Sequence, residues 1–532
     1  MKYNIKLNLA GVLTVLTIFF FYSCNYEEGM VLENETLVEN KGLVFDAPLP
    51  PIISDGPYNY KAKEYSFIQN QEEHKGKYYM PAGGPSNYPF ALIMHGDGFK
   101  HNEYDVLQRH LAKYGIASAS IQWESHKHDL SVNTEMTKHI NWLYNTYPNL
   151  TNSIALIGHS MGGGAVVRFA DDLETTTGKN VKSVIALAPS VQNDMFVKHN
   201  LINTIKGLLV IYSGNDDDVY GGKNTAGREE SGFKFYDECS TETQTFSNIF
   251  PTKDMIFFKD GRHRVYSDKS QSFPSYIYSG VNQNKVINAY ILAHLKLYLE
   301  NRPQYDQFFK YQRKPSNMPL NDVSEFYQQH TDAKKIVLAN FENNSATINY
   351  KGGAIVKSSS GIITMKVGNS WEIHPNSPHH TKAMRITWTK RKVGSSFVKF
   401  KYPSSYNLSS YSFLSIRASQ IYKNIYNTTD KEQDFYIRLK DKQGIYSKKV
   451  KISDFGVIPY PIKHSGHIKP GIIEQTPPIS KLTKSAMTST LIPLNAFGNN
   501  INLSNIKEVF LVFDVPGHET GAIMIDNLEF YK

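Results

Sequence analysis

The stretch Gly-His-Ser-Met-Gly-Gly-Gly at residues 158–164 is the most informative part of this 532-residue chain. It follows a short apolar run at residues 153–157 and precedes a segment, 165–173, that favours a helix. A serine in a sharp strand-to-helix turn needs small neighbours, because its strained backbone must push the hydroxyl outward. The stretch therefore predicts a nucleophile elbow centred on Ser160, although a Gly-rich turn alone would also produce this short pattern.

Later in the chain, two stretches supply the partners that a serine nucleophile needs. An apolar run leads into Ser-Gly-Asn-Asp-Asp-Asp-Val at residues 213–219, and a second one leads into a loop that carries His263 after a glycine. We select Asp217 as the acid of the triad, while Asp216 and Asp218 remain open as alternatives. The order serine, acid, histidine, each following a strand, is the order that the α/β-hydrolase fold requires.

An earlier strand candidate at residues 90–94 ends in the loop His-Gly-Asp-Gly, residues 95–98. In this fold the oxyanion hole uses the amide after the nucleophile and one amide from such a loop. We therefore expect the backbone N–H groups of Met161 and Asp97 to stabilise the tetrahedral oxyanion. In this chemistry Ser160 attacks the ester, the histidine carries the proton and the carboxylate orients the histidine, so catalysis needs no metal or organic cofactor.

Residues 88–309 resemble the dienelactone-hydrolase, cutinase and bacterial polyester-hydrolase branch of the α/β-hydrolases, with the glycine-rich heptapeptide as the specific part. The resemblance implies a mostly parallel sheet with helices on both faces, and hydrolysis of carboxylic esters. Two positions depart from the polyester hydrolases, which usually have aromatic residues where this chain has Asp97 and Ser190. The only cysteines, Cys24 and Cys239, also do not provide the disulfide that often lies near the catalytic histidine of that branch.

The amino terminus has the pattern of a bacterial lipoprotein signal. Two lysines precede an apolar core at residues 9–21, and Ser23 stands directly before Cys24. The core is shorter than the roughly 20 residues that a membrane-spanning helix prefers. We expect residues 1–24 to be the signal peptide and Cys24 to carry the lipid. Asn-Tyr-Glu-Glu at residues 25–28 resembles the export tag of surface lipoproteins of the Bacteroidota, which implies the cell surface and the outer membrane.

Length and composition predict two folded domains after this signal. With 40% hydrophobic and 13% aromatic residues, most of the chain has the composition of a globular protein. We expect a tether at residues 25–45, an α/β-hydrolase domain at 46–312, and a polar linker at 313–334. Residues 335–532 consist of short alternating runs rich in Ser, Thr, Val, Ile and Tyr, which is typical of an all-β sandwich.

Residues 335–532 also resemble jelly-roll carbohydrate-binding modules of the galactose-binding-like type, through an opening Phe-Glu-Asn and a closing Ile-Asp-Asn-Leu. The resemblance implies that the first and last strands lie side by side. It also implies a structural calcium ion held by Glu342 and Asp526, unless these are solvated charges at strand ends. Trp371 and Trp388 are candidate platforms for stacking sugars, with burial in the core as the alternative.

Charge is distributed unevenly along the chain. Residues 335–532 carry 26 Lys and Arg against 13 Asp and Glu, whereas the remaining residues carry 32 against 36. The excess predicts either a solvated basic face or an anionic partner, such as a uronic-acid or sulfated glycan or a lipopolysaccharide surface. Nucleic acid is not expected as a partner, since no recognisable nucleic-acid-binding motif accompanies the charge.

These patterns together predict a lipid-anchored serine esterase that removes acetyl, feruloyl or similar acyl groups from a polysaccharide. A lipase or cutinase-like polyesterase is the first alternative, and a non-catalytic glycan-binding surface lipoprotein is the second. Every candidate catalytic residue precedes residue 335. The sequence therefore predicts that deletion of residues 335–532 spares the hydrolysis of small soluble esters.

Overall fold

The structure is a computed structural model, and it describes residues 48–125, 130–190, 207–219, 232–238, 252–258, 261–268, 277–315, 317–318, 323–330, 335–358, 363–389, 396–461 and 483–532. The predicted signal peptide, its Cys24 and the predicted tether lie outside these residues. Within the described part of the chain, no helix combines the length and the apolar character needed to cross a membrane.

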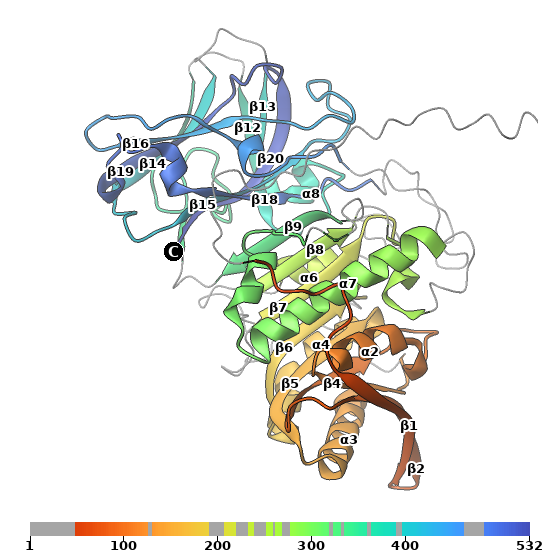
Figure 1. The fold of residues 1–532 in the computed structure, drawn as a ribbon. Coiled ribbons are helices and arrows are strands. Elements are labelled where there is room, and N and C mark those ends of the chain that lie inside the picture. Colours follow the sequence, from red (N-terminus) through yellow and green to blue (C-terminus); the bar gives the residue numbers. More distant parts are fainter. Residues whose placement is uncertain are drawn as a thin grey trace, which may run out of the picture. The chain divides into compact units, whose positions relative to one another are not determined.

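Nine described strands form one sheet in the order β1-β2-β4-β3-β5-β6-β7-β8-β9 (Figure 1). They are β1 (Asn59–Gln69), β2 (Glu72–Ala82), β3 (Tyr88–Met94), β4 (Ala117–Ile121), β5 (Leu150–His159), β6 (Asn180–Leu187), β7 (Gly207–Ser213), β8 (Thr252–Phe258) and β9 (Val323–His330). Strands β3 to β8 run parallel to their neighbours among themselves, while β1, β2 and β9 are antiparallel additions at the two edges. All residues of β4, β7 and β8 are buried, as expected for strands covered on both faces.

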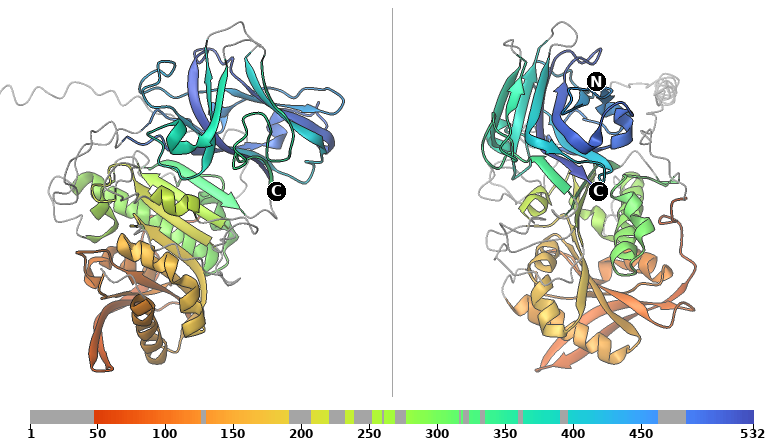
Figure 2. Two further views of the ribbon diagram at one scale, coloured as in Figure 1. Left: turned by 180° about the vertical axis from the view of Figure 1, so that it is seen from behind. Right: turned by 90° about the vertical axis from the view of Figure 1, so that its left-hand side faces the viewer.

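Helices cover both faces of this sheet, which Figure 2 shows in its edge-on view. They are α2 (Asp105–Lys113), α3 (Leu130–Thr146), α4 (Met161–Arg168), α5 (Ala170–Thr177), α6 (Gly232–Glu238) and α7 (Ile277–Tyr298). Helices α2 and α7 contact each other, and α5 contacts both α3 and α4. The prediction of an α/β-hydrolase fold is confirmed. The single helix expected at residues 165–173 is instead two helices, which meet at Phe169.

The segment predicted as a linker, residues 313–334, contains strand β9. This strand pairs with β8 along its length, from Thr252 opposite His330 to Phe258 opposite Val323. It therefore completes the edge of the first sheet. The polar composition of the segment did not predict this strand. An edge strand can pair through its backbone alone, so it does not need an apolar side-chain pattern.

The carboxy-terminal region is built from two antiparallel sheets. One contains β10 (Lys335–Ala339), β12 (Thr364–Asn369), β13 (Lys382–Trp388), β15 (Phe413–Gln420), β18 (Thr488–Pro493) and β20 (Gly521–Tyr531). The other contains β11 (Ile355–Lys357), β14 (Phe397–Tyr406), β16 (Tyr436–Asp441), β17 (Val450–Lys451) and β19 (Ile506–Val512). The first strand pairs with the last, since Lys335 lies opposite Tyr531, as the resemblance implied.

The two sheets enclose a core of their own, which includes Trp388, Phe400 and Phe530. A few apolar residues of this region, among them Ala486 and Met487, belong instead to the hydrophobic cluster of the α/β sheet. The carboxy-terminal region is therefore a β-sandwich, and the outer face of one of its sheets, with Ala383, Ala522 and Met524, shares a core with the hydrolase fold.

Candidate active site

Ser160 lies between β5 and α4 in a conformation that few non-glycine residues adopt, with φ 55° and ψ −120°. Its backbone N–H donates to Leu187 O at 2.8 Å, and its carbonyl oxygen accepts from Ser190 N at 2.9 Å. The side chain does not cap α4. The surrounding strands therefore hold the strained turn, and the hydroxyl is not used as a helix cap.

Three glycines make this turn possible through close backbone contacts. A Cβ on Gly158 would lie 2.0 Å from Gly162 O, and one on Gly162 would lie 2.4 Å from Met94 O. A Cβ on Gly96 would meet the Cβ of Ser160 at 2.7 Å. Real Cβ atoms do not approach so closely, so the start of α4 and the loop after β3 meet at the serine only because these positions lack side chains.

His263 begins a short 3₁₀ helix, η2 (His263–Tyr266), after β8, and its imidazole pairs with a buried carboxylate. Its Nδ1 lies 3.0 Å from Asp216 Oδ2, and the Asp216 side chain is fully buried. The second oxygen of Asp216 accepts from the backbone N–H groups of Asp218 and Val219, at 3.0 and 2.7 Å. Both carboxylate oxygens are therefore fixed, and one of them points at the imidazole.

This placement differs from the choice of Asp217 as the acid. Asp217 Oδ1 accepts from the backbone N–H of His263 at 3.1 Å, and no bond to its imidazole is formed among the described residues. The three consecutive aspartates after β7 have identical side chains, so residue type does not distinguish the acid of the triad. Only the dihedral angles of the turn decide which carboxylate points inward, and a sequence pattern does not give those angles.

Burial and the aspartates act in opposite directions on the pKa of His263. Burial disfavours the imidazolium, but the charge and hydrogen bond of Asp216 more than offset this, so the pKa lies above its ordinary value. Its Nε2 is buried and has no hydrogen-bond partner within the described part of the chain. A general base requires a lone pair that no other group uses, and in unliganded enzymes the contact to the nucleophile is often long.

His159, the residue before the serine, was missed by the sequence analysis. It is fully buried; its Nδ1 lies 2.9 Å from the Tyr104 hydroxyl, and its Nε2 lies 3.0 Å from the carbonyl oxygen of His263. Its ring also packs 4.9 Å from the ring of His263. Since a carbonyl only accepts, the Nε2 carries the proton. His159 thus connects the elbow to the loop that carries His263. The sequence signal that could have indicated this role is a polar residue at the end of an apolar strand.

The loop predicted to supply the oxyanion hole lies directly against the elbow. His95 O accepts from Trp123 Nε1 at 2.9 Å, and Asp97 Oδ1 accepts from Ser125 Oγ at 2.8 Å. Since Gly162 touches the Met94 and His95 carbonyls, the first turn of α4, where Met161 stands, meets this loop. The structure therefore brings the segments of both predicted donors together.

The β-sandwich adds one further group near the acid, which no catalytic motif indicated. Lys484 is buried, and its Nζ donates to Gly214 O at 3.4 Å, in the turn that holds Asp216. Burial lowers the pKa of Lys484 to about 8, and the nearby Asp216 carboxylate opposes that decrease. The turn that presents the acid is thus supported by a residue more than 260 positions away in the chain.

A second buried contact connects the sandwich to α6. Asp237 Oδ2 lies 3.0 Å from His379 Nδ1, and Asp237 Oδ1 lies 3.4 Å from Arg417 Nη2, with all three side chains at most 1% exposed. Burial opposes ionisation of Asp237, but His379 and Arg417 more than offset it and hold its pKa below the ordinary value. Removal of such partners leaves an uncompensated buried charge, which costs about 3–5 kcal/mol.

These contacts reverse the expectation that residues 335–532 are dispensable for small-ester hydrolysis. We predict that a chain ending at residue 334 gives little soluble, active protein. Asp237 would lose both the Arg417 cation and the hydrogen bond of the His379 imidazole, and the shared core would be exposed to water. Soluble yield and p-nitrophenyl acetate hydrolysis, compared with the full chain, measure this. If the truncated protein is soluble and has the same kcat/KM as the full chain, the contacts of Asp237 with His379 and Arg417 have no structural role.

The two tryptophans proposed as sugar platforms differ in environment. Trp388 is completely buried, stacks on Phe513 at 4.4 Å between ring centroids, and donates from Nε1 to His518 O at 3.1 Å. It cannot present a face to a sugar, so that prediction is wrong for Trp388. Trp371, in α8 (Ser370–Ile373), is half-buried beside His380, and its role stays a prediction.

The proposed calcium ligands are near each other, because the charge of Glu342 contributes to the raised pKa of Asp526. Burial is the larger cause, and together they raise that pKa to about 8. However, Asp526 Oδ2 already lies 3.6 Å from Arg417 Nη1, and Glu342 Oε1 accepts from the Lys382 N–H. Calcium prefers six to eight oxygen ligands. A cationic neighbour and two carboxylates do not fit that ion, so we assign no calcium to these residues.

Comparison with known proteins agrees with the α/β fold around Ser160. A family model described as the PGAP1-like alpha/beta domain matches residues 125–208, the part of the chain that contains the elbow and α4. No curated protein matches the chain. Fold, elbow and family match together define an α/β-hydrolase-like protein. The dienelactone-hydrolase, cutinase and polyester-hydrolase branch stays a prediction.

Proposed function

We propose that this protein is a serine carboxylic-ester hydrolase in which Ser160 is the nucleophile, His263 the general base and Asp216 the acid that orients it. The observation that carries the proposal is the buried pair of His263 Nδ1 and Asp216 Oδ2 at 3.0 Å, next to a strained serine turn. Asp216 takes the role for which Asp217 was selected from the sequence.

The proposed reaction follows from these roles. Ser160 Oγ attacks the ester carbonyl while its proton passes to Nε2 of His263, and the resulting imidazolium is stabilised by Asp216. The backbone amides of Met161 and Asp97 donate to the oxyanion, each contributing on the order of 10²–10³ in rate. The imidazolium then protonates the leaving alcohol, and water attacks the acyl-enzyme by the reverse route.

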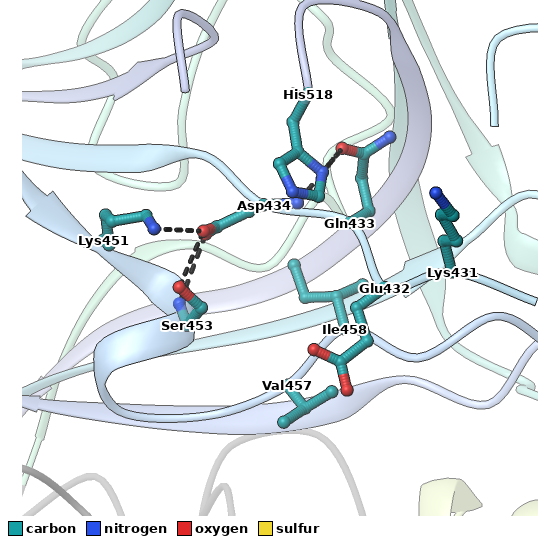
Figure 3. A pocket seen from close by; sticks show the side chains of 9 residues that line it. All are labelled: Lys431, Glu432, Gln433, Asp434, Lys451, Ser453, Val457, Ile458 and His518. Carbon is teal, nitrogen blue, oxygen red and sulfur yellow. Dashed lines mark hydrogen bonds and ion pairs between the residues drawn. The ribbon is translucent and has the colours of Figure 1, made fainter. Parts of the chain in front are cut away.

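The proposed substrate is an ester on a polysaccharide, at the surface of a cell to which Cys24 anchors the chain. The sandwich offers a cavity of about 380 Å³ in support, shown in Figure 3 and lined by Lys431, Glu432, Gln433, Asp434, Lys451, Ser453, Val457, Ile458 and His518. Asp434 accepts from Ser453 Oγ at 2.7 Å and lies 3.5 Å from Lys451 Nζ. The polar side chains in the lining of this cavity can hydrogen-bond sugar hydroxyl groups.

The acyl group is best identified by comparing substrates on one enzyme preparation. We expect kcat/KM to be highest for short p-nitrophenyl esters, with release of acetate or ferulate from acylated glycans. Activity that instead rises steadily with chain length and is absent on glycans would favour the lipase or polyesterase alternative. Absence of turnover on every ester would leave the glycan-binding alternative.

We predict that the full chain is retarded in gels that contain pectin or alginate, because of the positive excess in residues 335–532. Retardation should weaken between 0.1 and 1 M salt, as the Debye length falls from about 10 Å to about 3 Å. A gel containing a neutral glycan is the control for sieving. Equal migration in all gels would exclude an anionic glycan as a partner of this protein.

A further inference from the structure

Two histidines and one glutamate converge at the edge of the first sheet, away from the proposed catalytic residues. His74 is in β2, while Glu135 and His139 stand one helical turn apart on the same face of α3. His74 Nδ1 lies 2.7 Å from Glu135 Oε1, and His139 Nε2 lies 3.1 Å from the same oxygen. One ligand atom from each residue lies within 4.8 Å of the others, and no other such group of three occurs in the described ranges.

The surroundings of this cluster resemble those of a metal centre. His74 and His139 are 4% and 0% exposed, whereas the Glu135 side chain is 21% exposed and gives access from solvent. Phe67 packs against both imidazoles, at 5.0 and 5.2 Å between ring centroids. An apolar wall around polar donors strengthens their interaction with a cation and controls solvent access.

The hydrogen bonds of His139 direct its second nitrogen into the cluster. Its Nδ1 lies 2.9 Å from the Tyr65 hydroxyl, a contact that fixes the ring orientation as second-sphere partners of metal-bound histidines do. Lys138 is the cation that faces Glu135, at 3.8 Å from its other oxygen, and it also pairs with Glu72.

Hydrogen bonding places two imidazole donors on one carboxylate oxygen of this cluster. His74 Nδ1 and His139 Nε2 would both have to donate to Oε1 of Glu135. A metal ion would use the three converging lone pairs instead. Two imidazoles and one carboxylate suit Zn²⁺, which binds such donors at about 2.0–2.2 Å, rather than Ca²⁺ or Mg²⁺.

We propose that His74, Glu135 and His139 bind a transition-metal dication of the Zn²⁺ class, which fastens the β1–β2 hairpin to α3. The position argues for a structural role. Strand β2 is separated from β5, the strand of the elbow, by β4 and β3. At about 4.8 Å per strand spacing this places the cluster on the order of 14 Å from the elbow strand. The proposal therefore does not depend on the esterase function.

The test uses the full-length protein, stripped with a chelator and titrated with ZnCl₂ in isothermal calorimetry. We expect one tight site per chain, a higher thermal midpoint with Zn²⁺, and unchanged p-nitrophenyl acetate hydrolysis. Glu135→Gln should bind Zn²⁺ at least tenfold more weakly and lose the thermal shift. Glu73→Gln, an exposed carboxylate on the same strand as His74, is the matched control and should behave as wild type.

His74→Gln provides a second test, should Glu135→Gln fold poorly. Its Zn²⁺ affinity should also fall at least tenfold, while Co²⁺ in the wild-type protein should give the visible absorption of a tetrahedral site. No tight Zn²⁺ site in the wild-type protein would overturn the proposal and leave a hydrogen-bonded cluster. The same conclusion would follow if Glu135→Gln or His74→Gln bound Zn²⁺ as tightly as Glu73→Gln.

Discussion

Replacement of Ser160 by alanine is expected to reduce ester turnover by about 10⁴–10⁶ and to leave the fold intact. The loss is large because the triad acts as a unit, and without the hydroxyl no acyl-enzyme forms. The fold should persist because the serine side chain does not cap α4, and only its backbone pairs with Leu187 and Ser190. Initial rates on p-nitrophenyl acetate and thermal unfolding of the same preparation measure both parts.

Ser153→Ala is the matched control for this variant. Ser153 is on β5, the strand that leads into the elbow, seven residues before Ser160. Its loss should change kcat/KM by less than twofold. Turnover close to wild type in Ser160→Ala would exclude the proposed nucleophile, whereas a collapsed thermal midpoint would show that the variant reports on folding instead.

Local patterns predicted those parts of the site that depend on neighbouring residues. Apolar runs located β3, β5, β7 and β8, because strands covered on both faces must be continuously apolar. The glycines around Ser160 predicted a tight turn, and the structure shows why, since Gly158 and Gly162 each touch backbone from another element. His263 followed from its position after a strand, and it is the histidine that pairs with the acidic turn.

Long-range packing decided what the sequence left open. Whether Asp216 or Asp217 faces the imidazole depends on the turn angles, and Trp388 is buried because Gly521 leaves room for its ring. Lys484 reaches the acid turn from a region with the composition of a separate module. Contacts of this kind join residues between 47 and 270 positions apart, so no local pattern reports them.

Asp216→Asn is expected to lower kcat by on the order of 10⁴, while Asp217→Asn costs less than about tenfold. The amide at position 216 can no longer stabilise the imidazolium, and it allows the wrong tautomer of His263. At position 217 the side chain only accepts from the His263 backbone N–H, and an asparagine oxygen can do the same. Asp217→Asn is therefore the matched control for Asp216→Asn, with kcat on p-nitrophenyl acetate as the measurement.

The pH dependence separates the two aspartates further. Catalysis needs neutral His263, so activity is lost as pH falls through its pKa, and the raised pKa places this acid limb above pH 6.5 in the wild-type enzyme. In Asp216→Asn, burial still lowers the pKa of His263. The charge of Asp216, which is the largest influence that raises this pKa, is absent. The residual activity should therefore show an acid limb at lower pH, whereas Asp217→Asn shifts it little. Equal losses of kcat in the two variants, with an unmoved limb in both, would exclude Asp216 as the acid of the triad.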